Sequence, residues 1–273
     1  MNVTALDKIM LLGSMYSVLR LLPSFFKKIS TFFRPIDTTR FFEFAYMIKF
    51  MKKNDLHDLD ILDISSPHMM AYYLSKKNRV LKTNIDIDEK KFIKENKNLT
   101  FKLEDATRLS FPDNTFDMTY SISVIEHIYK EYSKAISEMI RVTKNGGYIY
   151  LTFPVAEKYK EEWLDGYVYS NQFSKERKTF FFYRFSESEI NYLLNQLQGV
   201  QILYKDIFWE RTIGLFDSVI RKLNFKLKNK YINFIKNIFI NNYYGFTMFP
   251  SKPVINFPKG KLFGNIHLIL KKD

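Results

Sequence analysis

Acidic side chains and a histidine follow several apolar runs of the sequence, at the points where those runs end. Asp86 and Asp105 each come after a short run that predicts a strand, and Glu126 and His127 come after another. In an open sheet of parallel strands, ligands bind outside the carboxyl ends of the strands. A carboxylate placed there accepts hydrogen bonds, and a histidine titrates near neutrality and can accept a proton. These residues therefore predict a ligand site beside a group that can move a proton.

Each of these side chains also has a purely structural interpretation. Asp86 lies 21 residues after Ser65, where a carboxylate can accept hydrogen bonds from both hydroxyls of a ribose. Alternatively it only caps the helix that follows, as Asp88 could equally do. Asp105 can simply begin a turn. His127 has the ordinary pKa of a general base, or it packs at a helix start and bonds a backbone carbonyl.

The elements that must position these residues alternate between strand and helix from residue 59 onward. Short apolar runs predict the strands, and apolar residues at helical spacing predict the helices between them. Residues 1–53 predict helices that break at Pro23 and Pro35, with an apolar stripe over 38–53. This rhythm predicts an α/β fold with a mostly parallel, doubly wound sheet. The predicted strands cover residues 60–64, 79–86, 99–103, 116–122, 148–153, 200–209 and 265–271, and the clearest helices cover 67–77, 132–142 and 186–197.

Local signals mark several boundaries between these elements. Ser66 before Pro67 predicts a hydroxyl cap at the start of a helix. The tripeptide at 145–147, Asn-Gly-Gly, predicts the end of a helix followed directly by a strand. A capping box that begins at Ser186 predicts another helix start. Residues 154–185 are polar and aromatic and predict a loop.

The charge of the chain is concentrated at its two ends. The net charge is +13, from 42 Lys and Arg against 29 Asp and Glu. Residues 1–53 carry a net +6, residues 54–210 a net −3 and residues 211–273 a net +10. A nucleic-acid enzyme usually carries its positive charge around the active cleft. We therefore expect no nucleic-acid partner, and the basic ends indicate an anionic surface, an anionic substrate or only a lysine-rich composition.

The composition also excludes some classes of site and indicates a compartment. The chain has 273 residues and no cysteine, which rules out disulfides, thiolate nucleophiles and cysteine-based zinc sites. The longest uncharged run near the N-terminus, residues 9–19, is too short to span a membrane and is not followed by a small-residue cleavage site. We expect a cytoplasmic protein.

Several motifs in register resemble a known family. Their order and spacing over residues 58–153 are similar to those of class I S-adenosylmethionine-dependent methyltransferases, most closely the group called type 11. The resemblance implies a Rossmann-like, seven-stranded sheet whose last strand is antiparallel to the rest. The motifs are Leu62-Asp-Ile-Ser-Ser-Pro-His68, Asn84-Ile-Asp86, Glu104-Asp-Ala106, Phe111-Pro-Asp-Asn-Thr-Phe-Asp117, Ser121-Ile-Ser-Val-Ile-Glu-His-Ile128 and Arg141-Val-Thr-Lys-Asn-Gly-Gly147.

The resemblance assigns roles toward S-adenosyl-L-methionine, the cofactor of this family. Asp86 would hold the ribose, Asp105 would receive the adenine amino group, and the backbone of Ala106 would lie at the edge of the ring. The N-terminal segment would fold over the cofactor, where Arg34 or Arg40 could clamp its carboxylate. The residues predicted to bind the cofactor are Asp63, Ser65, Asp86, Asp105, Ala106 and Ser121.

The first motif departs from the family pattern at its glycines. Three alternate positions that are glycine in the family are Ser65, Pro67 and Met69 here. Glycine serves there because it permits positive φ and close ligand approach, whereas proline has no N–H to donate. The loop is therefore predicted to take another shape. The missing glycines argue against an NAD or nucleotide-sugar enzyme, whose pyrophosphate needs that cradle, and they leave open a domain that has lost its cofactor.

The remaining expectations concern metal, acceptor and organisation. Some quinone-biosynthesis O-methyltransferases bind a divalent metal through Glu-x-x-Glu-His, but the first position is Ser123 here, so we expect no metal. We predict O-methylation of a small-molecule, glycan or lipid-linked acceptor, with either His127 or no protein group as the base. The alternative is a degenerate domain that binds a partner or an anionic membrane. The expected parts are an N-terminal helical segment over the cleft (1–53), the methyltransferase core (54–210), a basic, aromatic helical insertion (211–261) and a final core strand (262–273).

Overall fold

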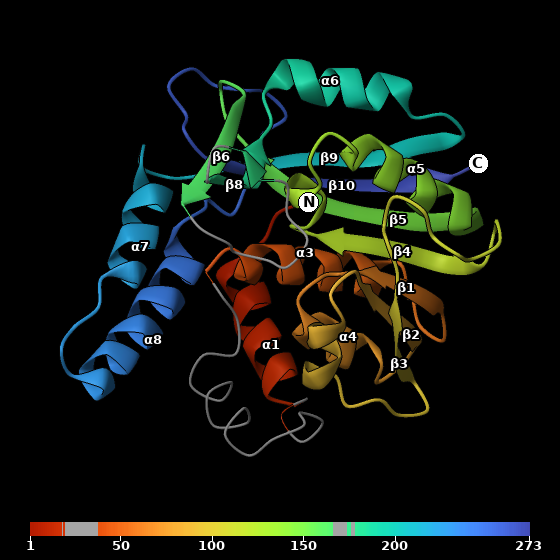
Figure 1. The fold of residues 1–273 in the computed structure, drawn as a ribbon, viewed down its shortest axis with the longest axis horizontal. Helices are drawn as coiled ribbons and strands as arrows, with labels where there is room; N and C mark the ends of the chain where they lie inside the picture. Colours follow the sequence, from red (N-terminus) through yellow and green to blue (C-terminus); the bar gives the residue numbers. More distant parts are fainter. Residues whose placement is uncertain (18, 20–37, 166–173, 176–177) are drawn as a thin grey trace.

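A computed structural model of the chain describes residues 1–17, 19, 38–165, 174–175 and 178–273. Seven of its strands form one sheet in the order β3-β2-β1-β4-β5-β10-β9. The first five positions are parallel, and β10 runs antiparallel to both β5 and β9. The predicted Rossmann-like sheet with an antiparallel last strand is confirmed (Figure 1). The strands are β1 (Asp60–Ile64), β2 (Arg79–Asn84), β3 (Leu99–Leu103), β4 (Phe116–Ile122), β5 (Thr143–Val155), β9 (Val200–Trp209) and β10 (Gly264–Lys272).

Helices cover both faces of this sheet because successive strand residues point to opposite faces. Ile61 belongs to one hydrophobic core and Leu62, its neighbour on β1, to the other. The first core packs against α1, α3 and α4, and the second packs against α5 and α6 (Figure 1). The described helices are α1 (Ala5–Tyr16), α3 (Arg40–Lys53), α4 (His68–Leu74), α5 (Tyr132–Val142), α6 (Glu187–Gln196), α7 (Leu215–Asn224) and α8 (Lys230–Thr247), with two short 3-10 helices, η2 (Ile87–Phe92) and η3 (Ile125–His127).

Helix α8 packs closely on α3 at a glycine. A Cβ atom added to Gly245 would lie 2.3 Å from Cδ2 of Phe41, a buried residue of α3. Lys8 of α1 joins the same place, since its ammonium donates to the carbonyl oxygens of Gly245 at 3.1 Å and Phe246 at 2.8 Å. The N-terminal helices and α8 are thus held together at the C-terminal end of α8, where a cation also complements the helix dipole.

Residues 154–185 do not form the predicted loop. Their described part contains β6 (Lys160–Asp165), β7 (Ser174–Lys175) and β8 (Lys178–Arg184), which form a second, antiparallel sheet in the order β6-β8-β7. The loop prediction failed because the alternation is masked by aromatic residues on both faces of β8 and broken by a bulge between Glu162 and Trp163. Phe180 and Tyr183 pack side by side in the core at 4.6 Å between ring centres.

Two predicted boundary signals have different roles in the structure. Pro67, and not Ser66, is the cap residue of α4, and the Ser66 hydroxyl instead accepts a hydrogen bond from the backbone N–H of Ile122 at 2.9 Å. Helix α5 ends at Thr143, where β5 begins, before the glycines are reached. Gly146, with φ +76°, lies in a bulge of β5 opposite β4. The glycines therefore shape the strand and do not end the helix.

Helices α7 and α8 lie within residues 211–261, and β10 lies within 262–273. The division of the chain into four parts stays a prediction. Among the described residues, no helix is long and apolar enough to cross a membrane.

Candidate functional site

The carboxyl ends of four parallel strands meet at one edge of the sheet. Ile64 at the end of β1 lies opposite Thr83, and Asn84 at the end of β2 lies opposite Leu103 at the end of β3. Adjacent strands lie about 4.8 Å apart, so the loops that leave them are neighbours. This edge therefore gathers side chains that are far apart in the sequence. The predicted site residues in its loops are Ser65, Asp86, Asp105, Ala106 and His127.

Asp63 supports this edge from inside the fold. Its carboxylate is fully buried and accepts hydrogen bonds from Tyr120 at 2.7 Å, from Lys82 at 3.2 Å and from the backbone N–H of Ser66 at 2.8 Å. Lys82 is buried too and also donates to the carbonyl oxygen of Ser66. The enclosed carboxylate of Asp63 positions the β1–α4 loop through the backbone N–H of Ser66. That Asp63 takes part in cofactor binding stays a prediction.

The β1–α4 loop keeps the backbone that a glycine would adopt. Ser65 has φ +54°, in the left-handed region, and its N–H donates to the carbonyl oxygen of Thr83 at 3.0 Å. For a residue with a Cβ atom this conformation costs roughly 1 kcal/mol. A positive φ is thus present at this position without a glycine, and the different shape of the loop as a whole stays a prediction. Pro67 follows at φ −56° and leads into α4.

Asp86 lies at the end of the β2 segment and caps η2. Its Oδ1 accepts a hydrogen bond from the backbone N–H of Asp88 at 2.9 Å. Its own N–H donates to Oδ1 of Asn84 at 2.8 Å. The capping alternative is thus present in the structure. It is compatible with the ribose role, because a carboxylate has two oxygens and several acceptor positions. The ribose role stays a prediction.

Asp105 is exposed after β3 and begins a turn. Its Oδ1 accepts hydrogen bonds from the N–H and from the hydroxyl of Thr107, each at 2.8 Å. Ala106 is half-buried beside it. A groove opens here between the loop after β3 and the start of α5, lined by residues 103–105 and 107–110 with Glu131 and Lys134. Asp105 and its loop are therefore accessible to a ligand at the strand end.

Apolar side chains are exposed between these two aspartates. Ile85, Ile87 and Leu103 are 49%, 57% and 50% exposed. Leu103 ends β3 opposite Asn84, and Ile85 follows Asn84 directly, so these side chains belong to neighbouring loops. A nucleoside presents hydroxyls, an amino group and the apolar face of a purine ring. Carboxylates flanked by exposed branched side chains have the matching chemistry.

Ser121 does not reach this edge. It is fully buried within β4 opposite Leu151 of β5. Its hydroxyl oxygen has no hydrogen-bond partner among the described residues. The role of Ser121 in cofactor binding stays a prediction. Ser123, which has φ +48°, is the serine at the end of this strand.

A buried carboxylate on α3, Glu43, was not predicted from the sequence. It accepts hydrogen bonds from Ser123, from Thr152 at 2.7 Å and from Asn265 at 3.1 Å, and it forms an ion pair with Arg40 at 2.5 Å. Burial alone would raise the pKa of Glu43, but Arg40 and the hydroxyl donors outweigh it and hold that pKa below its usual value. Helix α3 is thereby fixed over the ends of β4 and β5.

Glu126 and His127 lie beside this network in η3. The Glu126 side chain is almost fully buried, and its Oε2 has no hydrogen-bond partner among the described residues. Burial, helped by the charge of Glu43, raises the pKa of Glu126 to about 8. The His127 ring bonds the carbonyl oxygen of Phe181 through Nδ1, and its Nε2 lies 4.0 Å from Oε1 of Glu126. Burial lowers the pKa of His127 to about 4.

The structural alternative for His127 is therefore present: it packs at the helix start and bonds a backbone carbonyl. Its ring also contacts Phe181 and Phe182 of β8, with ring centres 5.3 and 6.0 Å away. The small sheet thus places aromatic side chains beside His127 at the carboxyl edge of the large sheet. The role of His127 as a base stays a prediction.

Of the two arginines predicted to clamp a carboxylate, the structure describes only Arg40. Arg34 lies outside the described residues. Arg40 directs its guanidinium to Glu43, and its clamp role stays a prediction. Within the described part of the chain, no three histidine, aspartate or glutamate side chains are arranged to hold a metal ion.

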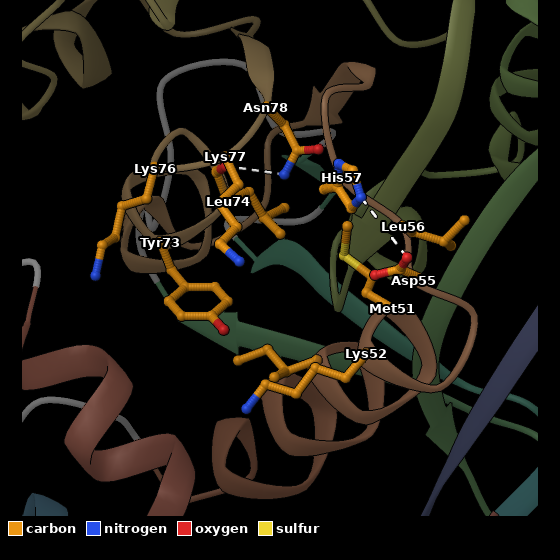
Figure 2. Close-up of a pocket in the computed structure, with 11 residues that line it drawn as sticks. Met51, Lys52, Asp55, Leu56, His57, Tyr73, Leu74, Lys76, Lys77 and Asn78 are labelled. Carbon is orange, nitrogen blue, oxygen red and sulfur yellow. Dashed lines mark hydrogen bonds and ion pairs between the residues drawn. The ribbon is translucent and has the colours of Figure 1, made fainter.

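A separate cavity lies at the opposite, amino-terminal edge of the sheet (Figure 2). It is formed by the end of α3, the end of α4 and the segment before β1, and Lys52, Lys76 and Lys77 line it. Its polar groups pair with one another, for example the Asn78 amide with the carbonyl oxygen of Leu74 at 3.0 Å. Ligands of open α/β sheets bind at the carboxyl ends of the strands, so this cavity is not the candidate site.

Comparison with known proteins agrees with the site at the carboxyl edge. The profile of a family described as a methyltransferase domain matches residues 65–151, from the β1–α4 loop to the middle of β5. Residues 65–151 thus carry a methyltransferase domain. A relative from Schizosaccharomyces pombe, uncharacterized methyltransferase C1B3.06c, is 42% identical over 52 residues, which are 19% of this chain and 18% of the relative. The match thus spans less than a fifth of that relative.

Solved structures share the fold of this methyltransferase domain at low identity. Coclaurine N-methyltransferase bound to N-methylheliamine and SAH is 15% identical, with a TM-score of 0.53 over 84% of this chain and 70% of that one. A protein of Bacillus halodurans described as a methyltransferase is also 15% identical, with a TM-score of 0.52 over 83% and 98% of the two chains. At these identities the likeness establishes the fold.

S-adenosylmethionine is the cofactor of this domain class, and the residues at the carboxyl edge of the sheet fit it. Asp86 and Asp105 suit the hydroxyl and amino groups, and the exposed side chains between them suit the purine ring. At the loop that follows β1, Ser65 has a left-handed backbone, the conformation that glycine permits. No phosphate cradle is needed there, because this cofactor has no phosphate.

Proposed function

We propose that this chain is an S-adenosylmethionine-dependent methyltransferase that methylates an oxygen of a small-molecule, glycan or lipid-linked acceptor. The observation that carries the proposal is the pair of carboxylates, Asp86 and Asp105, on neighbouring strand ends with exposed apolar side chains between them. Fold alone does not decide activity, so the chemistry of this edge is the main support.

Different residues at the carboxyl edge of the sheet would bind different parts of the cofactor. Asp86 would accept hydrogen bonds from the ribose hydroxyls through the oxygen that does not cap η2. Asp105 would receive the adenine amino group, with Ala106 at the ring edge. The loop at Ser65, held by Asp63, would meet the amino-acid end. When bound, the cofactor supplies a methyl group on a positively charged sulfur, so the protein mainly has to align the acceptor and receive a proton.

Two neighbouring groups could receive that proton, His127 and Glu126. If neutral His127 donates its Nδ1–H to the carbonyl oxygen of Phe181, its lone pair lies on Nε2. The low pKa of His127 makes it a weak base, however. Glu126 has a pKa near working pH and an oxygen with no partner among the described residues, which suits a general base better. We therefore propose Glu126 as a second candidate beside the predicted His127.

The surroundings of these groups support an oxygen acceptor with an apolar part. Phe181 and Phe182 are half-exposed beside His127. Aromatic rings favour apolar or sugar-ring surfaces. An acceptor hydroxyl has to lose a proton as it attacks the methyl group, so it needs a base. Buried Glu126 would be that base.

Calorimetric titration tests the cofactor first. We expect micromolar binding of S-adenosylmethionine and S-adenosylhomocysteine and no binding of NAD. Binding of NAD with neither of the others would contradict the proposal. Absence of all binding would favour the alternative that replacement of the family glycines at Ser65, Pro67 and Met69 has left a degenerate domain that binds a partner.

A pH profile of methyl transfer separates the two bases once an acceptor is known. If Glu126 receives the proton, the rate rises with pH to a plateau with a midpoint near 8, and Glu126→Gln removes the rise. If His127 receives it, the profile is flat through neutrality, and His127→Gln lowers the rate at every pH.

A further inference from the structure

Helix α8 exposes a row of large apolar side chains, which an ordinary surface helix does not. Tyr231, Ile235, Phe239 and Tyr243 are spaced four residues apart and are 68%, 52%, 70% and 63% exposed. Residues four apart lie on one face of a helix, so these four form a stripe of about 18 Å along the helix. We call these four side chains the α8 stripe. A globular protein normally places charged and polar residues on such a face.

Asparagines occupy the opposite, inward face of α8. Asn241 is buried and its Oδ1 accepts a hydrogen bond from the Thr38 hydroxyl at 2.8 Å. Asn237, one turn earlier, has a buried Oδ1 with no partner among the described residues. The inner face of α8 also carries Ile240 and Tyr244, which pack on the core, so the helix has apolar side chains on both faces. A row of large apolar side chains on the outer face is poorly suited to water and indicates that this face meets an apolar medium.

The turn before α8 carries positive charge at one end of the stripe. Residues 215–247 contain six lysines and arginines and a single acidic residue, Asp217, which is paired with Arg184 at 2.8 Å. Lys226 and Lys228 are exposed beside Phe225, itself 63% exposed. The segment that carries the stripe thus has an excess of positive charge. Large apolar side chains bordered by lysine are typical of helices that lie in the interface of an anionic membrane.

Helix α1, which Lys8 joins to α8, also exposes apolar side chains. Leu6, Ile9 and Met10 are 64%, 57% and 49% exposed, whereas Leu11 is buried. Two helices bound to each other thus both expose large apolar groups. Figure 1 shows α7 and α8 together at one end of the molecule, away from α5 and α6.

We propose that the α8 stripe and the lysines before it dock this protein on the surface of an anionic phospholipid bilayer. Helix α8 lies parallel to the membrane plane, with the aromatic and branched side chains among the acyl chains near the headgroups. Lys226 and Lys228 meet the negative lipid headgroups, each with an attraction that salt screens. The docking involves no membrane-spanning element and is independent of the methyl-transfer chemistry.

Co-sedimentation with vesicles tests the proposal on the full chain. We expect the protein to pellet with vesicles of equal parts phosphatidylserine and phosphatidylcholine, and to stay in solution with phosphatidylcholine alone. Added salt should release it, because the Debye length falls from about 10 Å at 0.1 M to about 3 Å at 1 M. Equal pelleting with both vesicles, or none with either, overturns the proposal.

Matched variants separate the stripe from general changes in surface. Ile235→Ser with Phe239→Ser should lower the partition coefficient at least about tenfold. Tyr192→Ser with Ile202→Ser, which removes exposed apolar groups from α6 and β9, should not. Lys226→Glu with Lys228→Glu should also lower it about tenfold or more, whereas Lys94→Glu with Lys97→Glu, the same change in net charge elsewhere, should leave it largely intact.

Two further measurements keep these variants interpretable. Thermal unfolding must show the stripe variant folded, which its exposed positions favour. Sedimentation velocity in the absence of lipid tests whether a second copy covers the stripe. A concentration-dependent dimer that Ile235→Ser with Phe239→Ser abolishes would overturn the bilayer proposal in favour of self-association.

Discussion

Glu43 of helix α3 accepts a hydrogen bond from the hydroxyl of Thr152, near the carboxyl end of β5, at a distance of 2.7 Å. The two residues are 109 positions apart in the sequence. Through this carboxylate the N-terminal segment is tied to the carboxyl edge of the sheet, so the part of the chain that covers the site is held by charge as well as by apolar packing.

Glu43→Gln should destabilise the protein by about 3 kcal/mol, because a neutral amide leaves Arg40 without its anion and cannot accept from every donor around it. Urea unfolding measures this, with Glu187→Gln on the surface of α6 as control and an expected change below about 1 kcal/mol. The pKa of Glu43 is lowered, so its contribution is present above its ordinary value of 4.5 and is lost as the pH falls through the folded value. The difference between wild type and variant should therefore shrink in acid; a difference that grows in acid would contradict this role.

Asp86→Ser should weaken binding of S-adenosylmethionine at least about tenfold, equivalent to about 1.4 kcal/mol, while the fold stays intact. Serine still caps a helix, but its shorter side chain cannot reach a ribose while it does so. Asp88→Ser, at the neighbouring exposed aspartate, is the matched control and should bind normally. Calorimetry decides the matter, and equal affinity for the two variants would assign Asp86 to capping alone.

Glu126 should make the protein less stable as the pH rises. Its pKa is about 8 in the folded chain against an ordinary 4.5, so between these values the folded chain holds a proton that the unfolded chain has released. The free energy of unfolding therefore declines as the pH increases across that interval, by a few kcal/mol.

Glu126→Gln should remove this decline and be more stable than wild type at alkaline pH. Urea unfolding across buffers that span the two pKa values measures the slope. Glu131→Gln, at a largely exposed side chain paired with Lys134, should leave the slope unchanged. A slope that persists in Glu126→Gln would show that another group carries it.

Gly245→Ala and Gly13→Ala should have effects of opposite sign. Alanine is favoured over glycine in a helix by about 1 kcal/mol. Around Gly13 no atom lies within 4 Å of the added methyl group, so this variant should be more stable. At Gly245 the methyl group meets the ring of buried Phe41 at 2.3 Å, and overpacking of that kind costs about 1–3 kcal/mol. Thermal unfolding of the pair measures both, and a stabilised Gly245→Ala would mean that α8 is not held against α3.

The elements with strong periodicity could be predicted from the sequence almost to the residue. Strands β1, β3, β4 and β9 and helix α5 begin and end where their sequence patterns predict. For β1 and β4 the reason is burial between two neighbouring strands, whereas β3 and β9 are the edge strands of the sheet. The sheet β6-β8-β7 could not be predicted, since its pairing depends on contacts with Tyr129 and on a bulge. Neither feature produces an alternation of apolar and polar residues in the sequence.

The site could be predicted in position and only partly in detail. Its edge follows from strand ends, which the sequence marks with Asp86 and Asp105. That Asp63 is enclosed could not be foreseen, because its partners Lys82 and Tyr120 lie on other strands. Glu43 was missed for a similar reason: an acidic residue in the first turn of a helix is usually on the surface, and only the folded sheet brings Ser123 and Thr152 to it.

The position of β10 between β5 and β9 has a consequence for biosynthesis. Residues 264–272 leave the ribosome after every other strand of the large sheet, so until then the edges of β5 and β9 that face β10 have no partner. Unpaired apolar edges invite pairing with other chains. Nascent chains stalled before this strand should therefore depend on chaperones, whereas release of the last strand closes the sheet in a single step.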